Sequence, residues 1–449
     1  MVGIQKDSSN TVRNLFLFLI GLGNVKVYFY GIMGVSEFFV FAVAPFVFLG
    51  NIRKLKKDGF FPFIYWLVAL LVALIISSRY NHTAVPYVIK TLAVFYSVFA
   101  HYVVFYRLLR NNYMGLGWYY LGGVFALAIA VIFGISPTAS VDESGIGYVS
   151  ATKSLEDMID GQLFFTSIGE ELLSLPLIAT YFKTPLIFSA LAPIAIVIMN
   201  FLVTISGRSS SLIALLTSGF ILLGQKSRVK MRRMSKHLFL LFIVFGIILL
   251  GFKTVYKYLA LSGSLDESVK EKYILQTEKG DSMLNLIMSG RKEFFIGLSA
   301  ALRRPIIGYG PFPEDRFGIT DQFLSKYGSQ TEYEYFKEVE RLRKGRIKLA
   351  THSHIIGAWV HYGIIGFAFY VYFIYIIFRH LRRYVSAIPQ WYGYFAILIC
   401  HYAWDVFFSI FAGRTRFALF VVCLCFAKAI GDGRLLLPYK MEINAREYE

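Results

Sequence analysis

Long apolar runs separated by short basic loops dominate the sequence, and this pattern decides what the chain can fold into. Apolar runs of about 20 residues are long enough to cross a bilayer as helices, whose backbone hydrogen bonds are satisfied internally. Of the 449 residues, 56% are hydrophobic and only 16% are charged, with a mean hydropathy of +0.57. These values exclude an ordinary soluble protein, and the chain is predicted to be an all-α polytopic membrane protein.

Apolar length predicts about twelve transmembrane helices, which the Lys and Arg residues of the short loops orient. The predicted spans lie at about 14–31, 34–50, 60–77, 86–106, 116–134, 161–182, 185–205, 210–224, 237–258, 353–378, 390–411 and 417–431. Basic clusters such as 53–57 and 226–236 are assigned to the cytoplasm, together with both chain ends. The net charge of +18 is therefore attributed to topology and anionic lipid, and no nucleic-acid partner is expected.

One long polar segment lies between the ninth and tenth spans. The chain is interpreted as a single transmembrane domain over residues 1–449, with an external loop module inserted at 259–350. Apolar residues recur at helical spacing through 281–305, which predicts one amphipathic helix on the outer membrane surface. The charged stretch 333–348 is expected to form a second helix that leads directly to His352, at the rim of the bilayer.

Several cationic or titratable side chains fall on the predicted external side. They are Arg208, Arg291, Arg303, Arg304, His352, Arg414 and Arg416. Arginine binds phosphate through two parallel hydrogen bonds, and histidine accepts a hydroxyl proton near neutral pH. This combination predicts glycosyl transfer from a polyprenyl diphosphate, in which arginines neutralise the leaving group and His352 activates the acceptor. The external side has no cluster at metal-ligand spacing, so no metal or other cofactor is expected.

Plainer roles remain open for the same residues. His352 can simply cap the tenth span, and Arg208 can extend its charge to the membrane surface from the end of an apolar helix. Arg291 can anchor an amphipathic helix at the interface. Arg303 and Arg304 are interpreted first as lipid or loop contacts.

Asp405 and His354 are secondary candidates, together with Arg304, Arg414 and Arg416. Asp405 lies inside a predicted span, where a carboxylate is costly and therefore suggests function, although it can instead pair with Arg414 or Arg416. His354 is an alternative catalytic base, since it lies only two residues from His352.

The stretch THSHIIGAWVHYGIIG contains His352 and Ser353, followed after nine residues by Gly363 and, three positions later, Gly366. This pattern resembles the O-antigen ligase and polymerase superfamily of bacterial envelope glycosyltransferases. Two preceding stretches, SGRSSSLIALL and IMSGRKEFFIGLSAALRRPIIGYGPF, also resemble segments of that family. The likeness covers roughly residues 185–385 in detail.

The resemblance implies a GT-C-like helical fold in the bacterial inner membrane, with the active site on the periplasmic side. It also implies an undecaprenyl-diphosphate-linked glycan donor, a glycan acceptor, diphosphate contacts from Arg208 and Arg291, and His352 as catalytic base. Two positions depart from the family pattern: Ser353 stands where Asn is frequent, and His361 where an acidic residue is common. Neither of these two residues is therefore offered as catalytic.

The favoured function is an inverting, metal-independent polymerase of O-antigen, capsule or exopolysaccharide repeat units. An O-antigen ligase that transfers the polymer to lipid A core is the alternative, and the choice rests on the greater number and variety of envelope polymerases. A lipid-linked oligosaccharide flippase or transporter is the alternative of another class, but its charges would lie at mid-membrane. Membrane lipids, a chain-length regulator and a separate flippase are the further expected partners.

Overall fold

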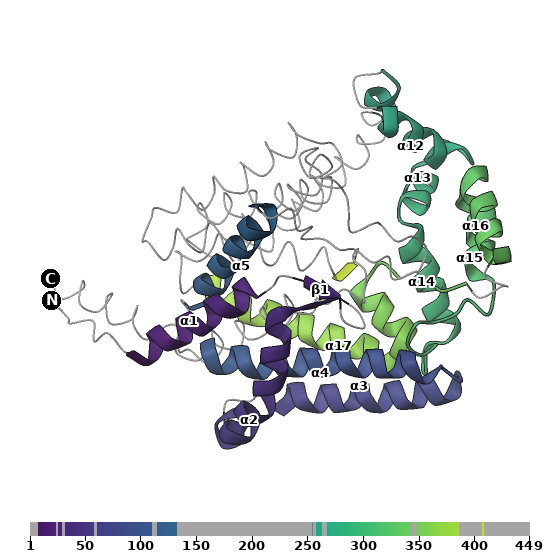
Figure 1. Cartoon of the computed structure of the whole chain (residues 1–449). Helices are drawn as coiled ribbons and strands as arrows, with labels where there is room; N and C mark the ends of the chain where they lie inside the picture. Colours follow the sequence, from purple (N-terminus) through teal and green to yellow (C-terminus); the bar gives the residue numbers. More distant parts are fainter. Residues whose placement is uncertain are drawn as a thin grey trace.

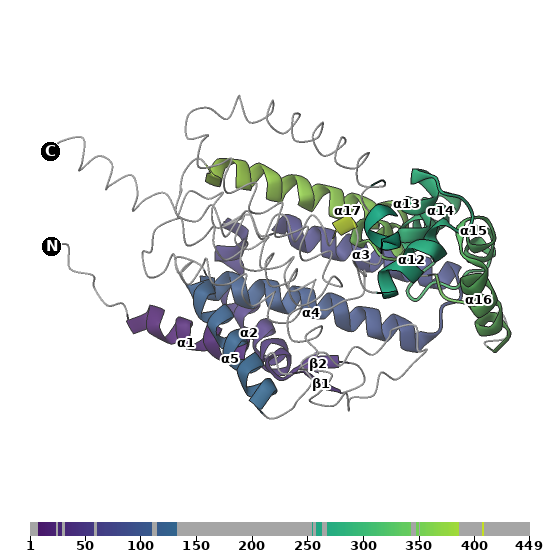
Figure 2. The same ribbon diagram turned by 90° about the horizontal axis from the view of Figure 1, so that it is seen from above.

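The protein is mostly helical, as Figures 1 and 2 show. The computed structural model describes residues 8–23, 26–28, 32–57, 61–109, 115–132, 254, 257–262, 267–342, 347–349, 351–385 and 406–407. Within these ranges, the helices long and apolar enough to cross a membrane are Ser36–Lys56, Phe61–Tyr80, Val85–Leu109 and His354–Tyr372. These helices confirm the coarse class of a helical membrane protein, while the number of spans and the domain division stay predictions.

Several predicted spans lie outside the described residues. They are the spans at about 161–182, 185–205, 210–224 and 417–431. Only short pieces of the predicted spans 237–258 and 390–411 are described.

The first predicted span, 14–31, is wrong in its second half. Helix α1 (Ser8–Leu22) is followed by an antiparallel hairpin of β1 (Lys26–Tyr28) and β2 (Ile32–Gly34). Gly23 marks the change, because its carbonyl accepts a hydrogen bond from the backbone N–H of Ser36 at 2.9 Å. This contact returns the chain to the start of the next helix and leaves no room for the helix to continue.

The next four helices match their predicted spans to within a few residues, except that α2 runs on through the basic cluster 53–57. They are α2 (Val35–Lys57), α3 (Phe61–Tyr80), α4 (Val85–Leu109) and α5 (Gly115–Ile132). α5 packs against α1 through glycines: a Cβ atom at Gly21 would overlap the backbone of Tyr119, and one at Gly122 would overlap that of Phe18. Such small residues allow helix backbones in membranes to approach closely.

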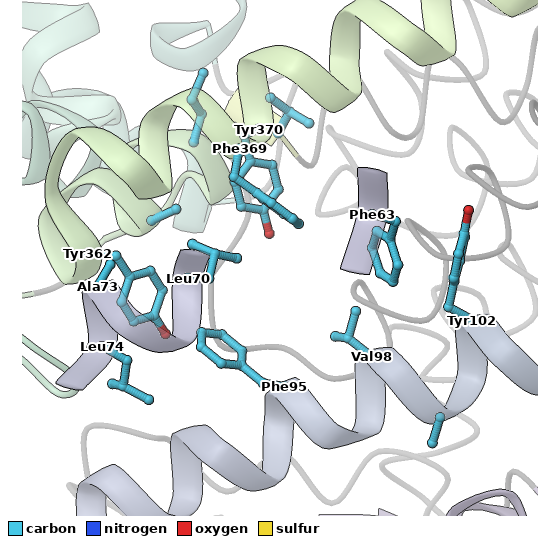
Figure 3. Packing of buried hydrophobic residues seen from close by; sticks show 14 of the residues in the cluster. Phe63, Leu70, Ala73, Leu74, Phe95, Val98, Tyr102, Tyr362, Phe369 and Tyr370 are labelled. Atoms are coloured by element: carbon cyan, nitrogen blue, oxygen red, sulfur yellow. The ribbon is translucent and has the colours of Figure 1, made fainter. Parts of the chain in front are cut away.

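The core of the described bundle lies between α3, α4 and the later helix α17 (His354–Val385) (Figure 3). Its aromatic contacts join distant parts of the sequence: the rings of Phe63 and Tyr102 are 3.9 Å apart, and those of Phe95 and Tyr362 are 5.4 Å apart. Aromatic pairs of this kind contribute about 0.5–1.5 kcal/mol each beyond their buried area.

α17 is not one straight helix. Its backbone breaks at Gly363, where φ is 64° and ψ is −152°, a region open essentially to glycine alone. A Cβ atom at Gly366 would overlap the carbonyl oxygen of Ala358, whereas residues eight apart in a straight helix are separated by about 12 Å. The chain therefore doubles back at Gly363, and the span predicted over 353–378 is interrupted by this bend.

The two halves of α17 lie against each other on either side of this bend. We call residues 354–362 the first arm and residues 364–385 the second arm. The rings of Trp359 and Phe367, one from each arm, are 4.7 Å apart. The second arm then runs along α3.

The loop before α15 closes the bend from outside. The backbone N–H groups of Tyr309 and Gly310 donate to the carbonyls of Val360 and His361, at 2.7 and 3.1 Å. These are end carbonyls of the first arm, which have no partner within a helix that stops there. The GYG triplet thus serves as the cap of a broken helix.

Glycines make this contact possible. Gly308 and Gly310 have φ values of 74° and 82°, and a Cβ atom at Gly363 would overlap the carbonyl of Ile306. Small residues such as Gly363 and Gly366 commonly allow a neighbouring membrane helix to come close. Here they instead admit the 306–310 loop and the first arm of the same helix.

The external loop module is helical, as expected. Its helices are α12 (Glu267–Thr277), α13 (Met283–Gly290), α14 (Lys292–Arg303), α15 (Ile319–Tyr327) and α16 (Gln330–Leu342). The single amphipathic helix predicted over 281–305 is wrong, because the chain breaks at Arg291, with φ −132° and ψ 35°. α13 and α14 are separate helices on either side of this residue.

The charged helix also ends earlier than predicted. α16 spans Gln330–Leu342, and residues 347–349 are extended, although the predicted helix runs to 348. The carbonyl of Ile347 accepts from the N–H of Asp315 at 2.7 Å, and the N–H of Leu349 donates to Pro313 at 2.8 Å. This pairing satisfies the backbone in place of a helix that would continue to His352.

The loop module covers one end of the bundle. Asn81, just after α3, donates its side-chain amide to the carbonyl of Gly308 at 3.1 Å and accepts at its own carbonyl from Arg316 at 2.7 Å. The predicted span 60–77 leads away from the cytoplasmic cluster 53–57, so the orientation from sequence puts residues 79–83 on the external side. The loop module, also assigned to that side, meets them at this end of the bundle.

Candidate functional site

Ser353 fixes the backbone next to the predicted base. Its fully buried hydroxyl accepts a hydrogen bond from the N–H of Ile356 at 3.2 Å and donates to the carbonyl of Val406 at 2.8 Å. The first contact is an N-cap, which satisfies an otherwise unpaired amide at the helix start. Ser353 thus caps the first arm and ties it to the residue after Asp405. Asn, which is frequent at this family position, is an equally good N-cap residue.

α14 packs directly on this helix start. A Cβ atom at Gly297 would lie 3.2 Å from a methyl group of Ile356 and 3.3 Å from one of Thr351. The close packing brings the first turn of α14 next to His352. Figure 1 shows α14 beside the bent end of α17.

The first turn of α14 contributes a carboxylate to the site. Oε2 of Glu293 lies 3.8 Å from Nδ1 of His352. The His352 side chain is 43% exposed and that of Glu293 is 27% exposed, so the imidazole remains accessible while its partner is mostly covered. An imidazole so placed can accept a proton on one face and be steadied by the carboxylate on the other.

Arg291 lies at the break between α13 and α14, two residues before Glu293. Partial burial lowers the pKa of Arg291, and the charge of Glu293 opposes that shift. A guanidinium nevertheless remains charged in a partly dry site, which suits it to phosphate. Glu293 therefore interacts with both predicted functional residues of this region, His352 and Arg291.

His352 stands just before the start of the first arm of α17, and the first arm lies against the second. The ring of its neighbour His354 is 6.1 Å from that of Tyr370, which is seven residues beyond Gly363 and so about 10 Å further along the second arm. Tyr372, on the same stretch, packs against Trp66 of α3 with ring centroids 5.6 Å apart. The start of α17 therefore lies beside the second arm, about 10 Å along that arm from the bend.

The two other histidines of this stretch are built into the packing. His354 is buried beside Tyr370. The carbonyl of His361 accepts from the hydroxyl of Ser77 at 3.1 Å and from Gly310 at the bend. His352 is the more accessible of the two candidate bases, His352 and His354.

Arg304 is at the other end of α14, about 20 Å from Arg291 by helix rise. Its guanidinium donates to the side-chain oxygen of Asn81 and lies 5.1–5.5 Å from the ring centroids of Tyr80, Tyr309 and Phe317. Arg304 thus connects the loop to α3 and does not join His352 and Arg291.

Its neighbour Arg303 donates to Gln322 of α15 at 2.9 Å. This contact agrees with its interpretation as a loop contact.

The remaining predicted site residues are Arg208, Asp405, Arg414 and Arg416, which lie outside the described residues. Their convergence with His352 stays a prediction.

Sequence reasoning missed two residues of this region, Glu293 and Asn81. Glu293 follows a predicted site arginine by two positions, but nothing in the sequence pairs it with a residue 59 positions later. Asn81 stands in a short turn, where asparagine is ordinarily explained by turn geometry.

Comparison with known proteins agrees with the motifs. Residues 194–371 match the family model described as O-antigen ligase, and this segment contains Arg208, Arg291 and His352. No curated protein matches the chain. Residues 194–371 are thus similar to the O-antigen ligase family, in agreement with the resemblance carried by the motifs.

Proposed function

We propose that this protein is a glycosyltransferase of the bacterial inner membrane that polymerises lipid-linked repeat units of a surface polysaccharide. The observation that carries the proposal is the grouping of His352, Glu293 and Arg291 inside the segment matched by the family model. The donor is a glycan on undecaprenyl diphosphate, and the acceptor is a sugar hydroxyl of another lipid-linked unit.

In the proposed reaction, the acceptor oxygen attacks the anomeric carbon of the donor from the side opposite the diphosphate. The new carbon–oxygen bond forms as the bond to the diphosphate breaks, and the diphosphate leaves with the electron pair, which inverts the anomeric centre. The hydroxyl proton passes to His352. Arg291, with Arg208, neutralises the leaving group, so the proposed step uses no metal.

The position of the site supports a lipid-linked substrate. The loop module contacts the 79–83 turn, at the end of the bundle that the orientation from sequence assigns to the periplasm. A base beside this loop module suits a diphosphate that a carrier lipid presents at the membrane surface.

An O-antigen ligase is the second candidate. The description of the matched family favours it, and the same residues serve either reaction. The two differ in acceptor: another lipid-linked repeat unit for the polymerase, and lipid A core for the ligase.

Gel electrophoresis of the surface glycan distinguishes the two functions. In a strain deleted for the gene, a surface glycan reduced to one repeat unit supports the polymerase, whereas long polymer that accumulates on the carrier lipid supports the ligase. Unchanged polymer length and attachment would contradict both.

Complementation then tests the base. His352→Ala should insert into the membrane normally and lose about 100-fold or more of the activity, because general-base catalysis contributes that much. His82→Asn is the matched control, since His82 is exposed, lies in the turn after α3 and has a positive φ that Asn tolerates. Near-normal polymer from the His352→Ala strain would refute the role of His352.

A further inference from the structure

We propose that Glu293 is a positioning residue that holds His352 with Nδ1 toward α14 and Nε2 toward the acceptor hydroxyl. This inference rests on the proposed function, because it assigns the orientation of the base in that reaction. Glu293 acts through His352 and needs no contact with either sugar.

Contacts with neighbouring elements fix the backbone at both residues of the Glu293–His352 pair. On one side, Glu293 is in the first turn of α14, and the preceding Lys292 pairs with Glu332 of α16 at 2.7 Å. On the other side, His352 directly precedes Ser353, whose buried hydroxyl is bonded on both sides. Neither backbone can turn freely, so the pair is placed by the fold and not by two flexible surface chains.

The packing of α14 on the start of α17 brings the two backbone segments together. Gly297 is one turn beyond Glu293 on α14, and it contacts Thr351 and Ile356 on either side of the histidine. A Cβ atom at Gly297 would lie 3.2–3.3 Å from methyl groups of these two residues, which is closer than ordinary van der Waals contact. The glycine therefore allows α14 to lie close to the helix start that carries His352.

The 3.8 Å separation is that of an ion pair, and a small side-chain rotation converts it into a hydrogen bond. Catalytic hydrogen bonds are commonly longer before substrate binds. A proton on Nδ1 that faces the carboxylate leaves the lone pair of Nε2 free for the acceptor. When Nε2 takes the hydroxyl proton, the ionised carboxylate stabilises the imidazolium, which later returns its proton to water.

Other charged groups also act on the imidazole. Arg291 and Lys292 on α14 disfavour a second positive charge, and Glu332 offsets Lys292. On α17, the titratable groups closest to the pair in sequence and packing are His354 and Tyr370.

The test uses the purified full-length chain in lipid nanodiscs. The donor and acceptor are lipid-linked repeat units extracted from the gene-deletion strain. Glu293→Gln removes the charge at constant shape, and Glu293→Asp keeps the charge on a shorter side chain. Glu338→Gln is the matched control, because Glu338 is an exposed carboxylate of α16 that pairs with Arg341 of the same helix at 2.6 Å.

We expect Glu293→Gln to lower kcat by about 10- to 100-fold, with the KM for donor little changed. Loss of the negative charge makes the imidazole harder to protonate, so the rise of the rate with pH should move to lower pH by about half a unit. Glu293→Asp should lie between Gln and the native protein. Glu338→Gln should leave both the rate and the pH profile as they are.

The outcomes separate this inference from the proposed function. If His352→Ala is inactive while Glu293→Gln keeps the native kcat and pH profile, the positioning role is wrong and the function stands. A Glu293→Gln variant that changes only the KM for donor also overturns it, because the carboxylate would then act on Arg291. An active His352→Ala variant would reject the function together with the inference.

Discussion

Two arginines, Arg291 and Arg304, flank α14. They look alike in the sequence, but their surroundings in the structure differ. At the end we call the His352 end, Arg291 is partly buried beside an acidic residue and an accessible imidazole. At the end we call the Asn81 end, Arg304 donates to a neutral amide and is surrounded by three aromatic rings. The His352 end contains an imidazole that can gain or lose a proton during a reaction. The Asn81 end is a structural contact between α14 and α3.

The comparison shows that one helix, α14, carries a structural contact at its Asn81 end and the candidate site at its His352 end. The Asn81 end fixes α14 to α3 and carries the loop that caps the bend in α17. The bend returns the first arm of α17 to α14, which places His352 beside Glu293. The bend at Gly363 and the loop that caps it therefore bring the first arm, and with it His352, to α14.

The largest expected effect comes from breaking the bend. Gly363→Ala should abolish both folding of this region and activity, because the new Cβ would overlap the carbonyl of Ile306 and the backbone conformation is open essentially to glycine. The measurement is the yield of monodisperse protein after detergent extraction, followed by polymer formation in the deletion strain.

Gly318→Ala is the matched control for this change. Gly318 also has a positive φ, of 61°, but a Cβ atom there would meet nothing within 4 Å. Its cost should be only the backbone term of about 1–2 kcal/mol. If the two variants behave alike, the capped bend is not what holds the site together.

A smaller effect should separate the two arginines. Arg291→Ala should raise the KM for the lipid-linked donor, by about 10-fold or more, because one charged contact to the diphosphate is lost. Arg291→Lys should restore only part of the affinity, since Lys lacks the planar fork.

Arg304→Ala should instead lower thermal stability and leave the KM of the folded fraction unchanged. Its contacts are the amide of Asn81 and aromatic rings, and such contacts stabilise by about 1–3 kcal/mol. Unfolding in detergent, followed by fluorescence, gives the stability. An increase in KM for both variants would place both arginines on the donor and remove the distinction between the ends.

Much of this architecture can be predicted from hydropathy. The bounds of α3, α4 and α5 agree with their predicted spans to within a few residues, because apolar length is a strong signal. The helical loop module and the pairing of residue 352 with a segment containing Arg291 were also expected.

The bend in α17 could not be predicted in this way. Hydropathy counts apolar residues, and both arms are apolar, so a helix that doubles back gives the same signal as one that continues. The signals that separate the two are local: a glycine pair in the helix and a second glycine pair, Gly308 and Gly310, in the loop. Only the structure shows that these two pairs contact each other.

Glu293 escaped prediction for a related reason. Its pairing with His352 depends on how α14 crosses the first arm, and the sequence alone does not give a crossing between elements so far apart in the chain. The predicted amphipathic helix over 281–305 even placed Arg291 in the middle of a helix. The break there changes the direction in which Arg291 and Glu293 point relative to α13.

The smallest expected effect concerns Ser353. It tests whether a loss of stability also lowers kcat at the His352 end of α14, in contrast to the Asn81 end. Ser353→Ala removes the cap of the first arm and the bond to Val406, which should lower stability by about 1–2 kcal/mol. Because this cap fixes the backbone next to His352, kcat should fall by several fold as well, whereas Arg304→Ala should lower stability alone. Ser353→Asn should retain most of both, since Asn is an equally good cap. If Ser353→Ala lowers stability without lowering kcat of the folded fraction, the orientation of His352 does not depend on the cap, and the His352 end is less rigid than its hydrogen bonds indicate.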